Sequence, residues 1–142
     1  MISILSLKGA DHMIFTIENE KITGLLKFGN IPISANDEQG FRPYELLISS
    51  LVGCSGTLLS NILQKKRIAT RRIEIKVDSI RNPAKANRIE HISIKANVFS
   101  NKGLTEQQSN KLSELVIGNC GMIQSVIGSV GITLEITFST EI

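Results

Sequence analysis

The segment from Tyr44 to about Lys66 constrains the fold of this chain more than any other. Its residues are apolar or small at most positions, so a helix built from them has almost no polar face. Pro43 suits the start of this helix, because the N–H that proline lacks would have no partner in the first turn. A helix that is apolar on most faces is a buried one. We therefore expect a long central helix that the rest of the fold encloses.

Short segments with alternating apolar residues flank this helix on both sides, as is typical of strands that bury one face. Thr105 and Gln108 stand at the spacing of a helix capping box, and Gly118 to Gly121 would end that helix. The expected elements are strands at 2–7, 13–18 and 21–28, the long helix, strands at 72–80 and 89–99, a helix after Thr105, a short helix at 122–127 and a strand at 132–138. The order βββ-α-ββ-αα-β predicts an α+β fold with antiparallel strands.

Composition points to one globular domain, residues 1–142, with enough apolar content to bury a core. The net charge of +3 is concentrated after the long helix, where cations favour a helix C-terminus. Nucleic-acid binding usually requires a longer stripe of basic residues with aromatic side chains on which bases stack, yet aromatic residues make up only 4% of this chain. No continuous apolar run approaches the ~20 residues that span a bilayer. We expect neither a nucleic-acid nor a membrane partner.

The N-terminus lacks the basic leader and cleavage site of a signal peptide, so we expect a cytoplasmic protein. A reducing cytoplasm disfavours a permanent disulfide, whereas a transient one there is usually catalytic or sensory. His12 and His91 show no metal-ligand spacing around either of the two cysteines. We therefore expect no metal and no cofactor.

The two cysteines, Cys54 and Cys120, are the candidate reactive groups. Cys54 lies midway along the long helix, and Cys120 lies where the later helix breaks. Both could be inert small core residues, which is the commonest fate of a free cysteine. If they meet in space, a Cys54 thiolate could instead attack a peroxide, and Cys120 could condense with the resulting sulfenic acid.

A reactive thiolate needs a positive neighbour that lowers its pKa, and Arg42 is the nearest candidate in the sequence. Arg42 could equally be an ordinary solvated loop residue. Glu45 stands nine residues before Cys54, which places the two on opposite helix faces, about 13 Å apart. Glu45 is therefore interpreted as a helix-start residue, favoured by the positive end of the helix dipole.

The residues Pro43-Tyr44-Glu45-Leu46-Leu47 through Gly53-Cys54, together with Asn119-Cys120, resemble the OsmC/Ohr family of osmotically inducible and organic hydroperoxide resistance proteins. The order of elements agrees over essentially the whole chain. The resemblance implies an intertwined homodimer whose sheets embrace the central helices. It also implies reduction of organic hydroperoxides, with Cys54 as the peroxidatic and Cys120 as the resolving cysteine. A protein dithiol or lipoyl group would regenerate the thiols.

This chain departs from the peroxidase members of that family at two points. Those members place a glutamate directly after the helix-opening proline, where this chain has Tyr44. They also use an arginine from the N-terminal region, whereas no arginine precedes Arg42 here. Arg42 could substitute from the loop, and the Tyr44 hydroxyl could donate a hydrogen bond to a leaving oxygen. In addition, Gly121 stands where the family usually has proline.

Two functional hypotheses follow from the sequence. The first is a thiol-dependent redox protein that reduces peroxides through Cys54 and Cys120 as part of an oxidative stress response. The second is a dimeric OsmC-like module that holds a small apolar or electrophilic ligand and has weak or no peroxidase activity. The cysteine contexts favour the first hypothesis, and the missing glutamate and arginine favour the second.

Overall fold

The computed structural model describes residues 13–140, which divide between two compact units at the boundary between Leu47 and Ile48. The first unit contains a three-stranded antiparallel sheet in the order β1-β2-β3. Its strands are β1 (Ile14–Glu18), β2 (Lys21–Leu25) and β3 (Asn30–Ile33). Asn19 and Glu20 both have positive φ, as a two-residue type I′ turn between β1 and β2 requires.

The strand expected at 2–7 lies outside the described residues. The third strand of this sheet, β3, was not predicted from the sequence because Pro32 interrupts the strand pattern. Proline is tolerated there because β3 is an edge strand of the described sheet, whose outer side meets only an isolated bridge to Phe41, and an edge strand can lack a ladder N–H.

The helix α1 (Pro43–Lys65) begins at the proline, as expected, and continues into the second unit. By length and composition this helix could cross a membrane, although the sequence contains no continuous apolar run of that length. The buried residues of α1 recur every four positions: Leu51, Ser55, Leu59 and Leu63. The three leucines among them belong to the hydrophobic core. The rest of α1 is half-buried or exposed in the single chain.

The second unit contains a sheet in the order β4-β5-β6, formed by β4 (Thr70–Asn82), β5 (Arg88–Ser100) and β6 (Gly131–Ser139). The strands β4 and β5 are antiparallel, but β5 and β6 are parallel. The expectation of purely antiparallel strands is therefore wrong. The intervening helices α2 (Glu106–Asn119) and α3 (Gly121–Val126) form a crossover that returns the chain to the same end of the sheet, and such a connection produces a parallel neighbour.

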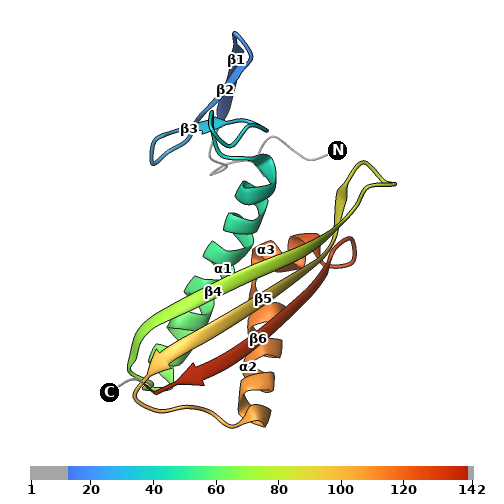
Figure 1. Cartoon of the computed structure of the whole chain (residues 1–142). Coiled ribbons are helices and arrows are strands. Elements are labelled where there is room, and N and C mark those ends of the chain that lie inside the picture. Colours follow the sequence, from blue (N-terminus) through green and yellow to red (C-terminus); the bar gives the residue numbers. More distant parts are fainter. Residues whose placement is uncertain (1–12, 141–142) are drawn as a thin grey trace, which may run out of the picture. The chain divides into compact units, whose positions relative to one another are not determined.

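The core of this unit lies between the sheet and its helices, which Figure 1 shows behind the strands. The central strand β5 contributes Ile92, Ile94, Ala96 and Val98, all nearly inaccessible to solvent. The helix α2 begins with the expected capping box between Thr105 and Gln108. Its buried residues Ser109, Leu112, Ser113 and Val116 occupy one helical face. The α+β fold and the order βββ-α-ββ-αα-β are thus confirmed.

Candidate functional site

Cys54 lies in the middle of α1, on the flank of its buried stripe. The side chain is half-buried and packs at the edge of the core cluster that contains Leu51 and Cys120. The preceding Gly53 is exposed, and a Cβ built there would meet no atom within 4 Å. The following Ser55 is buried and donates its hydroxyl to the Leu51 carbonyl. Cys54 therefore packs against the core but is only partly covered in the single chain.

Cys120 lies at the junction of α2 and α3 and is fully buried. Its backbone is extended, with φ −83° and ψ 110°, which ends one helix and begins the next. The Cys120 N–H donates to the Val116 carbonyl, and its own carbonyl accepts from the Gln124 N–H. Both backbone groups are thereby satisfied, so the break expected at Gly118 to Gly121 is a well-formed link between two helices.

The fold brings the two thiols into contact. Hydrogen bonds from the Met122 backbone N–H, from the Cys120 thiol and from the Gly121 N–H lower the pKa of Cys54 below its ordinary value. The N–H groups of Gly121 and Met122 belong to the first turn of α3, where backbone N–H groups have no acceptor within the helix. Cys120 does not cap them with its side chain. The Cys54 sulfur fills that place, and hydrogen bonding to a thiolate favours the charged form.

The pKa of Cys120 moves in the opposite direction. Burial raises it first, and its hydrogen bond and proximity to Cys54 raise it further. A buried thiol that donates a hydrogen bond to a neighbouring thiolate keeps its own proton as long as that neighbour is negatively charged. The arrangement therefore assigns ionisation to the more accessible Cys54 and the retained proton to Cys120.

Arg42 and Tyr44 occupy the start of α1 in the first unit. The Arg42 Nε lies 2.5 Å from the Glu45 Oε1, and both side chains are a little under half exposed. This ion pair raises the pKa of Arg42. Tyr44 is half-buried at the second residue of the helix. All groups that shift the pKa of Cys54 belong to the second unit, so roles for Arg42 and Tyr44 at the thiol stay predictions.

The two backbone donors, Gly121 and Met122, were not predicted from the sequence. Backbone N–H groups carry no side-chain signature, and only the start of a helix directly after Cys120 hints at them. Among residues 13–140 there is no group of three or more histidine, cysteine or acidic side chains placed to hold a metal. His91 instead lies within 3.2 Å of the Thr133 hydroxyl on the sheet, and His12 lies outside the described residues.

Comparison with known proteins agrees with this architecture. A family model described as OsmC-like protein matches residues 35–135. The chain belongs to the OsmC-like family. No curated protein gives a significant sequence match to this OsmC-like chain.

Solved structures share its fold. A hypothetical protein from Aquifex aeolicus is 23% identical with a TM-score of 0.81, covering 94% of this chain and 98% of the other. An OsmC-like protein from Mycoplasma pneumoniae is 15% identical with a TM-score of 0.75, covering 89% and 95%. The organic hydroperoxide resistance protein OhrB of Bacillus subtilis is 18% identical with a TM-score of 0.63, covering 89% and 96%. At these identities the likeness shows the fold, and function must be argued from the site.

Proposed function

We propose that this OsmC-like protein reduces organic hydroperoxides, with Cys54 as the nucleophile and Cys120 as the resolving thiol. The observation that carries the proposal is the contact of two thiols with opposite pKa shifts. An accessible thiol of lowered pKa is the kind that peroxides oxidise, because the thiolate is the reactive form. The buried thiol in contact with it supports the proposed resolving step.

The reaction has three steps. The Cys54 thiolate attacks the distal oxygen of ROOH, the O–O bond breaks, and Cys54–SOH and RO⁻ form; RO⁻ takes a proton and leaves as ROH. The Cys120 sulfur, giving up its proton, then attacks the sulfenic sulfur, which releases water and forms the disulfide. A dithiol of the protein or lipoyl type reduces the disulfide by two exchange steps and is itself oxidised. In the single chain Cys54 is only half-buried, whereas Cys120 is fully buried.

The proposal includes an intertwined homodimer of this single-domain chain, in which the sheets embrace the central helices. The first unit exposes Ile14, Phe15 and Ile17 on a single short strand, and Gly24 is its one buried residue among 13–47. A sheet of three short strands with exposed apolar side chains needs a partner surface to be stable. The half-buried and exposed apolar residues of α1 need the same cover. We place this dimer in a reducing cytoplasm, where the thiols are free.

Stopped-flow oxidation with cumene hydroperoxide and with hydrogen peroxide tests the thiol chemistry. Wild type should react faster with the organic peroxide, and Cys54→Ser should lose the reaction. Cys120→Ser should still be oxidised but should accumulate a sulfenic acid that dimedone traps at Cys54. Ser55→Ala, which changes the adjacent residue and leaves both thiols, is the matched control. Equal peroxide consumption by wild type and Cys54→Ser would eliminate the peroxidase proposal.

A ligand-binding role without efficient peroxidase chemistry is the second candidate. It is favoured by the Arg42–Glu45 ion pair, because that contact engages the arginine that would have to stabilise the thiolate. Under this alternative, the Arg42→Ala variant leaves the titration of Cys54 unchanged and wild type turns over peroxide only stoichiometrically. A titration displaced to higher pH in Arg42→Ala would favour the peroxidase instead.

A further inference from the structure

A second site is formed in the second unit, between the end of α1 and α2. A cavity of about 160 Å³ opens there, lined by Lys66, Leu104, Gln108, Lys111, Leu112 and Leu115. Lys66 follows Cys54 by twelve residues, about 18 Å along the helix axis. The Lys66 end of the cavity therefore lies away from Cys54, and neither cysteine lines the cavity. The inference drawn from it does not depend on the proposed peroxidase.

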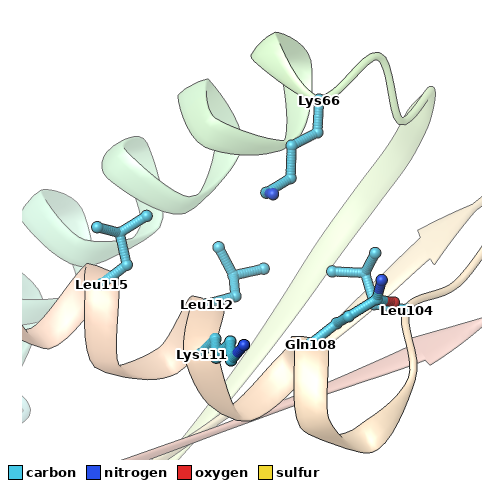
Figure 2. A pocket seen from close by; sticks show the side chains of 6 residues that line it. All are labelled: Lys66, Leu104, Gln108, Lys111, Leu112 and Leu115. Atoms are coloured by element: carbon cyan, nitrogen blue, oxygen red, sulfur yellow. The ribbon is translucent and has the colours of Figure 1, made fainter.

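The walls of the cavity are apolar. Leu112 is buried in the core beneath it, Leu104 is half-buried beside it, and Leu115 remains 47% exposed. Leu112 and Leu115 are three residues apart on α2 and so share a helix face. Figure 2 shows both side chains rising from α2 toward α1. An exposed leucine at the edge of a hollow with a leucine floor is an apolar surface that a ligand tail would cover.

The rim of the cavity carries two ammonium groups, one from each helical segment. Lys66 extends from the end of α1 toward α2, and Lys111 lies on α2 (Figure 2). Within residues 13–140 neither lysine side chain forms an ion pair or a hydrogen bond. No carboxylate lines the cavity. Two cations above an apolar floor complement a ligand with an anionic head and a short aliphatic tail.

The capping box holds this surface in place. The Gln108 Oε1 accepts the Thr105 N–H at 2.9 Å, and the Thr105 hydroxyl accepts the Gln108 N–H at 3.2 Å. These two bonds fix the first turn of α2, from which Lys111 follows directly. The Gln108 side-chain NH₂ donates no hydrogen bond among the described residues, so it is a third donor on the cavity wall.

We propose that this cavity binds a short-chain fatty carboxylate, with the carboxylate between Lys66 and Lys111 and the tail against the three leucines. Size sets the chain length, since an apolar cavity of about 150 Å³ holds a six-carbon molecule such as benzene. Hexanoate fits that volume with its head at the rim. Nucleotides fit poorly because the lining has no aromatic side chain on which a base would stack.

Titration of the full chain with sodium hexanoate, followed by ¹H–¹⁵N NMR, tests the proposal. Saturable shifts should be confined to amides around residues 66, 104–108 and 111–115. Hexylamine has the same tail with the opposite charge and should not bind. Acetate and inorganic phosphate have the charge without the tail and should bind at least about tenfold more weakly. Equal binding of hexylamine, acetate or phosphate would overturn the assignment.

Variants separate the contributions of head and tail. Lys66→Gln and Lys111→Gln should each weaken hexanoate binding about three- to fivefold, as expected for exposed ion pairs, and Leu115→Ser should weaken it further. Lys65→Gln removes a neighbouring charge that does not line the cavity and should leave the affinity unchanged. Cys54→Ser should also bind hexanoate normally, so failure of the peroxidase proposal would not affect this result. Unchanged affinity in the double variant Lys66→Gln/Lys111→Gln would refute the site.

Discussion

Replacing Gly121 by proline tests whether the first turn of α3 activates Cys54. Gly121 is the first residue of that helix, and its N–H is one of the donors that lower the pKa of the Cys54 thiol. Proline removes this N–H and little else. Its fixed φ suits a first helical position, and the preceding Cys120 already has the extended backbone that proline requires of its neighbour. The Gly121→Pro variant should therefore fold at least as stably as wild type.

The expected effect is about fivefold in the ratio of thiolate to thiol. A hydrogen bond to a charged group stabilises that charged group by about 1.5–3 kcal/mol. Gly121 makes a smaller contribution than the Met122 N–H and the Cys120 thiol, and the sulfur is partly solvated. We therefore take about 1 kcal/mol, which corresponds to about fivefold. The variant should need a higher pH to reach the same reactivity.

Gly121→Ala is the matched control. A Cβ at this position would meet no atom within 4 Å, and the φ of Gly121 is not positive, so alanine fits and retains the N–H. The assay is alkylation of Cys54 by iodoacetamide across a pH series, read by peptide mass spectrometry, with thermal melts to confirm folding. Identical pH profiles for the proline and alanine variants would refute the role of this donor. This holds whether both profiles match that of wild type or are displaced from it equally.

Three further predictions concern reactivity and stability. Since the pKa of Cys54 is lowered, its oxidation rate should rise with pH and level off at a lower pH in the native protein than in urea-unfolded chain; coincident profiles would contradict this. Arg67→Gly should raise the free energy of unfolding by about 0.5–1 kcal/mol. Arg67 has φ 58° just after α1, a conformation that glycine adopts at lower cost. An unchanged urea midpoint would count against this prediction. Leu59→Ala should cost about 2–5 kcal/mol in urea unfolding because Leu59 is buried in the core, whereas the exposed Asn61→Ala should change stability by less than about 0.5 kcal/mol; similar losses for both would contradict the packing described.

Features that depend on neighbours in the sequence could be predicted without the structure. Pro43 and the capping box of Thr105 and Gln108 placed the starts of α1 and α2 correctly, because caps act within one turn. Alternation located β4 and β5 to within two residues at each end. The strand β3 was missed because its proline hides the pattern, and a sequence does not show which strand lies at an edge.

Features that depend on distant contacts could not be predicted in this way. The predicted antiparallel direction of β6 was wrong. Its direction depends on the end of the sheet at which the α2–α3 crossover returns the chain. The Arg42–Glu45 ion pair, by contrast, joins residues only three apart, but it went unrecognised because Arg42 was considered as a partner for the thiol or as a solvated loop residue. The backbone donors Gly121 and Met122 were missed because every residue but proline carries an N–H, and only the packing of α3 against α1 selects these two.

The sequence by itself determined the order of elements and the two cysteine contexts, because helix caps, periodicity and glycine breaks act over a few residues. It also identified Cys54 and Cys120 as candidate reactive groups, but left open whether they were inert. Only the tertiary structure decided that the thiols touch, that Cys54 has the lowered pKa and that Cys120 keeps its proton. The reason is physical: burial, a helix terminus and a neighbouring sulfur set the pKa of a thiol, and all three arise from chain segments that meet only after folding.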